Sequence, residues 1–234
     1  MPFKNRSEAG RKLATALAAY RNQQPIILAL PRGGVPVAAE VATALKAPLD
    51  LILVRKIGVP TQPELAMGAV VDGSKPIIVR NENVIGLAGI TDSEFRAVCD
   101  SELGEIERRR QRYLGTRHRA EVTGHTAIVI DDGIATGATT RAALQATRMR
   151  KPRRLVLAVP VAPTENLAAL RSDADDVVCL EEYEFFGAIG FYYDDFRQVS
   201  DEEVIKYLSA SRCTYPRKHS SRRLDALLDE RSAG

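Results

Sequence analysis

Five short runs of mostly apolar, often β-branched residues are spaced along the chain. Their positions are 25–30, 49–56, 126–131, 153–162 and 175–180. Because these runs are apolar on both faces, they are typical of strands in a sheet that is covered on both sides. Segments with helical spacing precede or separate them, at 8–20, 35–46, 139–150 and 164–171. The alternation predicts an α/β fold with a doubly wound, mainly parallel sheet of about five strands.

One interval, 57–125, is too long to be a simple crossover between strands. It contains a predicted β-ribbon at 67–80 and a predicted helix that starts near Thr91 or Asp92 and runs to Leu114. We expect one domain over 1–234, with a core at about 25–56 and 126–180. The insertion at 57–125 and the segment 181–215 are expected to form a hood over one end of the sheet. A basic tail follows at 208–234, with a short helix predicted at 222–230.

Composition adds few constraints. The chain has 234 residues, 45% of them hydrophobic, and a net charge of +3, which is too small to indicate a nucleic-acid or membrane partner. The cysteines Cys99, Cys179 and Cys213 show no spacing typical of a disulfide framework or a zinc site, so we expect reduced thiols. Because no apolar run approaches the roughly 18 residues of a membrane span, we expect a cytoplasmic protein.

Unusual residues follow the first two predicted strands. The first strand is followed by PRGG, in which Arg32 offers a fixed charge while Gly33 and Gly34 let the backbone approach a ligand closely. The second strand ends in two cations, Arg55 and Lys56. Ligands of open α/β sheets bind beyond the carboxyl ends of the strands, so both stretches are candidate binding loops.

The third strand leads into DDGIATGATT, residues 131–140. The glycine and threonine loop opens a helix, and the unpaired amides of a helix N-terminus bind phosphate. Asp131 and Asp132 would repel that phosphate unless they face a sugar diol or a Mg²⁺ ion of the same ligand. A ligand with a phosphate, a ribose and a metal-bound pyrophosphate would occupy all three loops.

These motifs together resemble the type I phosphoribosyltransferases. The family signature of an apolar strand, two acidic residues and a Thr-Gly-x-Thr loop is matched by IVIDDGIATGATT at 128–140, with PRGG at 31–34 and VRK at 54–56 as further matches. The order and spacing cover residues 25–162. The stretches PELAMGAV and DFRQVSDEE, at 63–70 and 195–203, are similar to those of a group of uncharacterised bacterial predicted phosphoribosyltransferases.

The resemblance implies phosphoribosyl diphosphate (PRPP) as the ligand and Mg²⁺ as the cofactor. Asp131 and Asp132 would meet the ribose hydroxyls, and through them or through water the metal. The remaining implied roles fall into three groups: the 5-phosphate site Ala135, Thr136, Gly137, Ala138, Thr139 and Thr140; the pyrophosphate site Arg32, Gly33, Gly34, Arg55 and Arg197; and the catalytic residues Arg32, Lys56, Asp131 and Asp132. The resemblance also implies a cis or strained peptide between Pro31 and Arg32.

The acceptor of the phosphoribosyl group is left open as a nucleobase or another amine. Members of the family that act on 6-oxopurines usually carry an aspartate where this chain has Ala135, which makes hypoxanthine and guanine less favoured. Phe185 or Phe186 is implied as a platform that stacks on the base.

Two alternatives to an enzyme are a PRPP-sensing or nucleotide-sensing regulator and a scaffold that only binds partners. The basic run at 107–119 suits a solvated helix face with arginines paired to glutamates, and also suits the nucleic-acid contact of a regulator. Arg32 and Lys56 favour the enzyme, since a sensor has no need of cations on a leaving group. A homodimer is compatible with the sequence.

Overall fold

The computed structural model describes residues 2–73, 76–117 and 119–211. Most of the predicted basic tail, including its helix and Cys213, lies outside the described residues. The central sheet has five strands in the order β3, β2, β7, β8 and β9, and every neighbouring pair is parallel. These strands are β2 (Pro25–Ala29), β3 (Leu49–Leu51), β7 (Thr126–Ile130), β8 (Arg154–Pro163) and β9 (Asp176–Tyr183).

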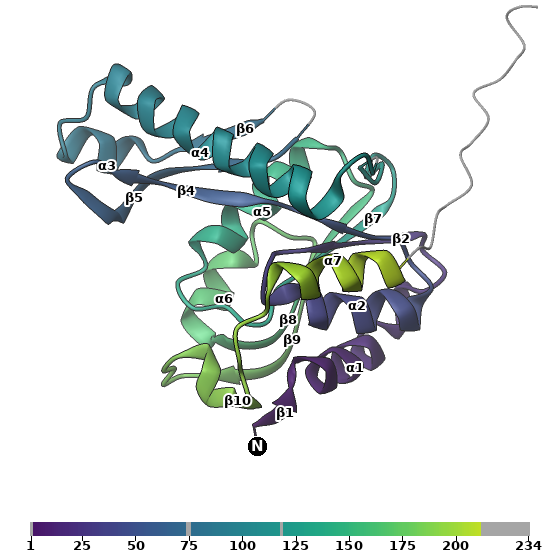
Figure 1. The fold of residues 1–234 in the computed structure, drawn as a ribbon. Coiled ribbons are helices and arrows are strands. Elements are labelled where there is room, and N and C mark those ends of the chain that lie inside the picture. The colour runs from purple at the N-terminus through teal and green to yellow at the C-terminus, as the bar shows by residue number, and fades with distance from the viewer. Residues whose placement is uncertain (1, 74–75, 118, 212–234) are drawn as a thin grey trace, which may run out of the picture.

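Helices cover both faces of this sheet, as the apolar pattern predicts. On one face of the sheet, Ile27 and Ile128 are buried in a core with residues of three helices. These helices are α1 (Arg6–Ala16), α2 (Gly34–Leu45) and α7 (Asp201–Ala210). On the other face, Leu28 and Val129 are buried in a core with residues of α5 (Ala138–Met149) and α6 (Thr164–Leu170). Alternate residues of each strand face opposite sides, so a strand must be apolar throughout. Figure 1 shows the two helix groups on opposite sides of the sheet.

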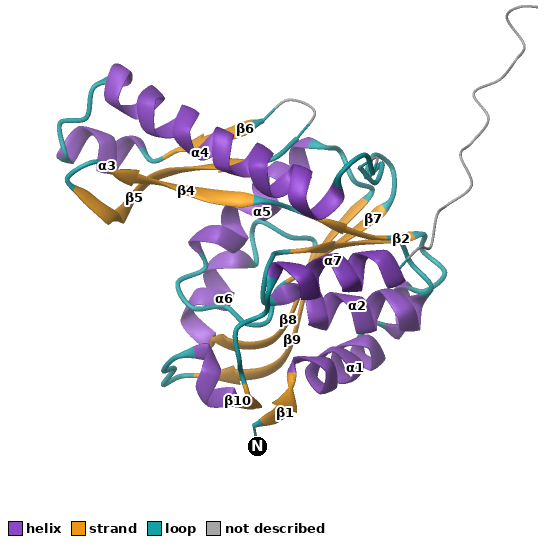
Figure 2. Cartoon of the chain, in the orientation of Figure 1, coloured by secondary structure: helices purple, strands orange, loops and turns teal. Residues whose placement is uncertain are grey.

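The insertion forms a second sheet rather than extending the first. Its antiparallel strands are β4 (Val54–Val59), β5 (Gln62–Val71) and β6 (Ile77–Arg80), followed by α3 (Glu82–Leu87) and α4 (Asp92–Leu114). Thr91 and Glu94 form a capping box that starts α4 where the sequence predicts it. Figure 2 shows α4 lying along this second sheet.

The prediction of one continuous strand at 49–56 is wrong, because this segment is split between two sheets. β3 ends at Leu51, and the backbone of Leu53 then pairs with Asp72 at the end of β5. Ile52 and Leu53 are buried in different cores, so the sequence stays apolar across the break. The hydrophobic pattern therefore does not indicate where the first strand ends.

Two segments near opposite ends of the described chain lie side by side. The strand β1 (Phe3–Asn5) pairs in parallel with β10 (Tyr193–Asp195), which follows the short 3-10 helix η2 (Ile189–Tyr192). A similar 3-10 turn, η1 (Ala18–Tyr20), ends the first helical segment. Ser200 and Glu203 form the capping box of α7, which packs between α2 and α4. α7, which lies within the segment 181–215 expected to form part of the hood, therefore packs into the main core.

Candidate functional site

The loops after β2 and β7 lie side by side in the middle of the sheet. β2 and β7 are neighbours, yet the helices that follow them, α2 and α5, cover opposite faces. Such a reversal of winding is the topological switch point at which open α/β sheets bind ligands. The PRGG loop and the DDGIATGATT loop are therefore brought together at the place where a ligand is expected.

Two glycines allow this close approach. A Cβ atom built on Gly33 would lie 2.0 Å from Oδ2 of Asp132, and one on Gly34 would lie 2.7 Å from the carbonyl oxygen of Ile130. A side chain at either position would force its neighbours to move, because real Cβ atoms do not approach other atoms so closely. The peptide between Pro31 and Arg32 is cis, as expected.

The two aspartates have different surroundings. Oδ1 of Asp131 accepts a hydrogen bond from the backbone amide of Asp132 at 2.9 Å. Burial, and then the neighbouring carboxylate of Asp132, raise the pKa of Asp131. Oδ2 of Asp132 instead lies 2.7 Å from Nε of Arg6 in an ion pair whose side chains are each only 10% exposed. The hydroxyl of Tyr193 donates to the carbonyl of Asp132 at 2.6 Å.

Sequence reasoning missed both Arg6 and Tyr193. Each belongs to a segment that is far from the motif in sequence and has no local pattern typical of a binding site. The only available signal was the Tyr-Asp-Asp-Phe-Arg stretch near the C-terminus, in which Tyr193 lies close to the predicted site residue Arg197.

The loop at 135–140 leads into α5, whose first backbone amides are not capped by a side chain. Gly137 has φ of +78° and is the N-cap of α5, so it has no side chain that could bond to the first amides of the helix. Ala135, Thr136 and the first two residues of α5, Ala138 and Thr139, are exposed or partly exposed, whereas Thr140 is buried. Asn166 donates to the carbonyl of Ala135 and holds the start of the loop. The arrangement suits a phosphate.

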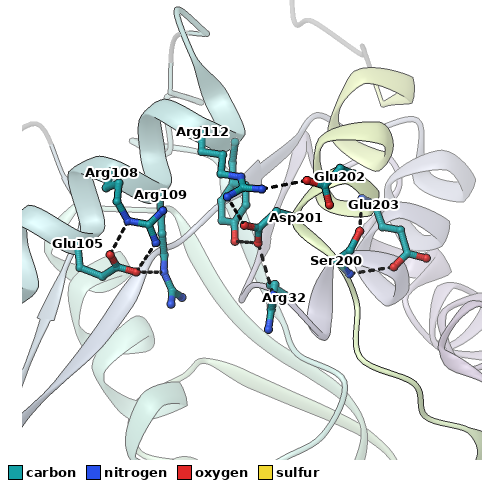
Figure 3. A network of polar contacts seen from close by, with 10 residues as sticks. Arg32, Glu105, Arg108, Arg109, Arg112, Ser200, Asp201, Glu202 and Glu203 are labelled. Atoms are coloured by element: carbon teal, nitrogen blue, oxygen red, sulfur yellow. Dashed lines mark hydrogen bonds and ion pairs between the residues drawn. The ribbon is translucent and has the colours of Figure 1, made fainter.

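Arg32 reaches toward the start of α7 (Figure 3). Its Nη1 lies 3.6 Å from Oδ1 of Asp201, which also accepts a hydrogen bond from the hydroxyl of Tyr113 at 2.6 Å. Arg112 approaches the other oxygen of Asp201 at 3.0 Å. The hydrogen bond from Tyr113, followed by the charges of Arg112 and Arg32, lowers the pKa of Asp201. An open cavity of about 240 Å³ is lined by Arg32, Arg112 and residues 198–202.

Four arginines of the basic run, Arg108, Arg109, Arg110 and Arg112, are paired with acidic residues. Arg108 and Arg109 contact Glu105 at 2.7 and 2.6 Å, one helical turn away (Figure 3). Arg110 lies 3.7 Å from Glu107, and Arg112 pairs with Asp201. The predicted pairing with nearby glutamates is confirmed for Arg108, Arg109 and Arg110. Arg112 instead pairs with Asp201 and Glu202 of α7.

Arg55 and Lys56 lie on β4, so their predicted place at the end of a parallel strand is wrong. The reason is the change of sheet after Leu51, which carries them into the insertion. Arg55 pairs with Glu102 of α4 at 2.6 Å, and Lys56 pairs with Glu64 of β5 at 3.2 Å.

Arg197 does not line the cavity that Arg32 lines. Its side chain is 75% exposed and contacts Glu203 at 3.1 Å, beside a smaller cavity of about 110 Å³ that Arg6 also lines. The two candidate aromatic platforms differ: Phe185 is 93% exposed, whereas Phe186 stacks on Tyr192 with ring centroids 4.7 Å apart.

No cluster of three or more histidine, cysteine, aspartate or glutamate side chains that could hold a metal occurs among the described residues. Mg²⁺ is usually bound through one or two carboxylates together with substrate phosphates, and Asp131 and Asp132 fit that mode. Within the same described part of the chain, no helix is both long and apolar enough to span a membrane.

Comparisons with known proteins agree with this geometry. The family model described as "Phosphoribosyl transferase domain" matches residues 4–196, so the chain belongs to the phosphoribosyl transferase family. Among solved structures, TT1426 from Thermus thermophilus is similar, with 41% identity and a TM-score of 0.78 over 89% of this chain and 98% of that one.

Two curated relatives come from strains of Mycobacterium tuberculosis, and each is named a "Putative phosphoribosyl transferase". Both are 45% identical to this chain over 88% of its length. The matched region covers 46% of the length of each relative, so the chain spans about half of these proteins.

Proposed function

We propose that this protein binds PRPP with Mg²⁺ and transfers the 5-phosphoribosyl group to a nitrogen acceptor, with release of pyrophosphate. The observation that carries the proposal is the contact between Gly33 and Asp132. It joins the loop suited to a pyrophosphate to the loop suited to a ribose phosphate at the switch point of the sheet.

Each part of PRPP has a matching group in the two loops. The open amides at the start of α5 and the hydroxyls of Thr136 and Thr139 suit the 5-phosphate, since the helix dipole favours an anion there. The carboxylate oxygens of Asp131 and Asp132 are acceptors for the ribose hydroxyls. The PRGG loop packs directly on the acidic pair and carries Arg32, whose guanidinium suits a pyrophosphate.

Asp131 and Asp132 would hold Mg²⁺ through the ribose hydroxyls or through water, and the metal would supply charge neutralisation to the leaving group. In the reaction the bond from the anomeric carbon to the pyrophosphate oxygen breaks, and a bond from that carbon to the acceptor nitrogen forms. Arg32 stabilises the charge that develops on the departing oxygen. The carboxylates stabilise the positive charge that develops on the ribose.

The cations of the insertion would act from the second sheet. Arg55 and Lys56 are paired with Glu102 and Glu64, so they would have to leave these partners to reach a pyrophosphate. Arg197 would have to leave Glu203 in the same way. We therefore assign the main leaving-group role to Arg32 and auxiliary roles to these three residues.

The acceptor is a nucleobase or another amine. Ala135 provides no carboxylate to a purine ring, which disfavours 6-oxopurines. Phe185 is free to stack on a planar base because its side chain is exposed, whereas Phe186 is already stacked on Tyr192.

The test is to incubate the protein with PRPP, Mg²⁺ and a panel of nucleobases and amines while measuring the release of pyrophosphate. Acceptor-dependent release that is lost in the Arg32→Ala variant supports the proposal. A protein that binds Mg²⁺ and PRPP but releases no pyrophosphate with any acceptor is a sensor instead. The ion pairs of Arg108, Arg109 and Arg112 do not favour a nucleic-acid-binding regulator, which would show steeply salt-dependent binding to RNA or DNA.

A further inference from the structure

Asp132 is held by residues from two segments near opposite ends of the described chain. Arg6, the first residue of α1, contacts the carboxylate with Nε, and its Nη1 donates to the carbonyl oxygen of Arg197 at 2.9 Å. Tyr193, from β10, holds the carbonyl oxygen of Asp132. The parallel pairing of β1 with β10 places these two segments side by side.

The guanidinium of Arg6 is fixed on several sides. Its Cζ lies 3.8 Å from the centre of the Phe196 ring, and the whole residue is 9% exposed. A planar guanidinium can donate to two acceptors in different directions while stacking on an aromatic ring. A lysine ammonium has neither the planar face nor the fixed fork, so it can replace the charge of Arg6 but not its geometry.

The same oxygen of Asp132 that contacts Arg6 also packs on the PRGG loop. Oδ2 is the atom that a Cβ on Gly33 would approach to 2.0 Å, so the carboxylate lies between the guanidinium of Arg6 and the backbone of Gly33. A shift of this carboxylate would therefore displace the loop that carries Arg32. Interiors packed this closely transmit small displacements.

We propose that Arg6 is a positioning residue for the PRPP site and acts through Asp132. By fixing the carboxylate, Arg6 sets the spacing between the PRGG loop and the loop of the acidic pair, and Tyr193 assists from the carbonyl side. This role rests on the proposed function. It differs from a purely structural link between the chain ends, because the effect of Arg6 on ligand binding must depend on the carboxylate of Asp132.

The experiment measures the dissociation constant of Mg²⁺–PRPP by calorimetry for the wild type, Arg6→Met, Asp132→Asn and the double variant. Arg11→Met is the matched control, because Arg11 lies on the same helix and pairs with Glu40 at the surface. Circular dichroism at the titration temperature confirms that each variant is folded. We expect Arg6→Met to weaken binding about tenfold or more, and Arg11→Met to change it by less than about twofold.

The double variant separates positioning from general destabilisation. If Arg6 acts through the carboxylate, adding Arg6→Met to Asp132→Asn should weaken binding by less than about twofold further. Full additivity of the two losses, or wild-type affinity in Arg6→Met, overturns the role of Arg6 while leaving the proposed function intact. A wild type that binds no PRPP overturns the proposed function, and the role of Arg6 with it.

Arg6→Lys keeps the test decisive if Arg6→Met does not fold. This variant retains the charge but loses the second hydrogen bond and the stacking on Phe196. Its affinity for Mg²⁺–PRPP should be about threefold or more below that of the wild type, and this loss should disappear in the Asp132→Asn background. Wild-type affinity in Arg6→Lys, or a loss that persists in that background, contradicts the proposal.

Discussion

Gly33 and Asp132 are in such close contact that a side chain on Gly33 would force one of them to move: a Cβ atom on Gly33 would lie 2.0 Å from Oδ2. Gly33 belongs to the loop after β2, and Asp132 follows β7. The contact makes the two loops a single packed unit, so a change in one of them must be felt in the other.

Gly33→Ala should therefore impair ligand binding directly. The added methyl group must displace Asp132 or the PRGG loop, and overpacking of this kind costs about 1–3 kcal/mol of stability. We expect the affinity for Mg²⁺–PRPP to fall about tenfold or more, measured by calorimetry below the melting temperature.

The matched control is Gly104→Ala in α4, where nothing lies within 4 Å of the added Cβ. Alanine is favoured over glycine inside a helix by about 1 kcal/mol, so this variant should bind normally and melt no earlier than the wild type. Normal PRPP binding by Gly33→Ala would show that the contact between the loops does not shape the site.

Asp201→Asn should tighten the binding of PRPP. Asp201 places a negative charge 3.6 Å from Arg32, where it opposes an anionic ligand beside the PRGG loop. Removing that charge should raise the affinity for Mg²⁺–PRPP about two- to fivefold at low salt, with a smaller gain at high salt. Asp92→Asn, at the distant start of α4, serves as the control. An unchanged or weaker affinity in Asp201→Asn would mean that this carboxylate orients Arg32 rather than competing with the ligand.

Arg32→Ala should reduce turnover more than it reduces PRPP affinity. The charge on the pyrophosphate grows as the bond breaks, so a cation there stabilises the transition state more than the ground state. We expect kcat to fall about 100-fold and the dissociation constant to rise about tenfold or less, compared with Arg11→Ala as control. Equal effects on kcat and on binding would restrict Arg32 to a binding role.

The contribution of Glu105 to the stability of the protein should be lost as the solution becomes acidic. Hydrogen bonds from Arg108 and Arg109 lower the pKa of Glu105 from 4.5 to about 2. A carboxyl whose pKa is lowered on folding stabilises the protein above its unfolded pKa, and this contribution is lost as the pH falls through the folded pKa. The melting temperatures of the wild type and Glu105→Gln should differ constantly above about pH 5 and converge toward about pH 2. A difference that stays constant over the whole range would mean that the ion pairs do not stabilise the fold.

The architecture of the sheet could be predicted because its signal is local. The parallel strands are mostly apolar on both faces, and the covering helices repeat their apolar residues every three or four positions. The break between Leu51 and Val54 could not be predicted, since all four residues across it are apolar. It is seen only in the strand pairing, in which Leu53 bonds to Asp72. The capping box of Ser200 and Glu203 was a local signal for α7 that the sequence interpretation did not use.

In the site, too, residues within short motifs could be predicted, whereas a residue placed by a contact between distant segments could not. Gly33, Asp131 and Gly137 belong to short motifs whose residue types match their chemistry, and these motifs do meet at one switch point. Arg6 reaches Asp132 only because β1 pairs with β10, which is a contact between distant segments that no local pattern indicates.

The most direct test of the account is a calorimetric titration of Mg²⁺–PRPP into the wild type and into the variant carrying both Asp131→Asn and Asp132→Asn. We predict that the wild type binds PRPP in a Mg²⁺-dependent manner. The folded double variant should bind at least about tenfold more weakly, a loss of about 1.4 kcal/mol, because it lacks the carboxylates proposed for the ribose and its metal. Equal affinity of the two proteins, or no binding of PRPP by the wild type, would contradict the account.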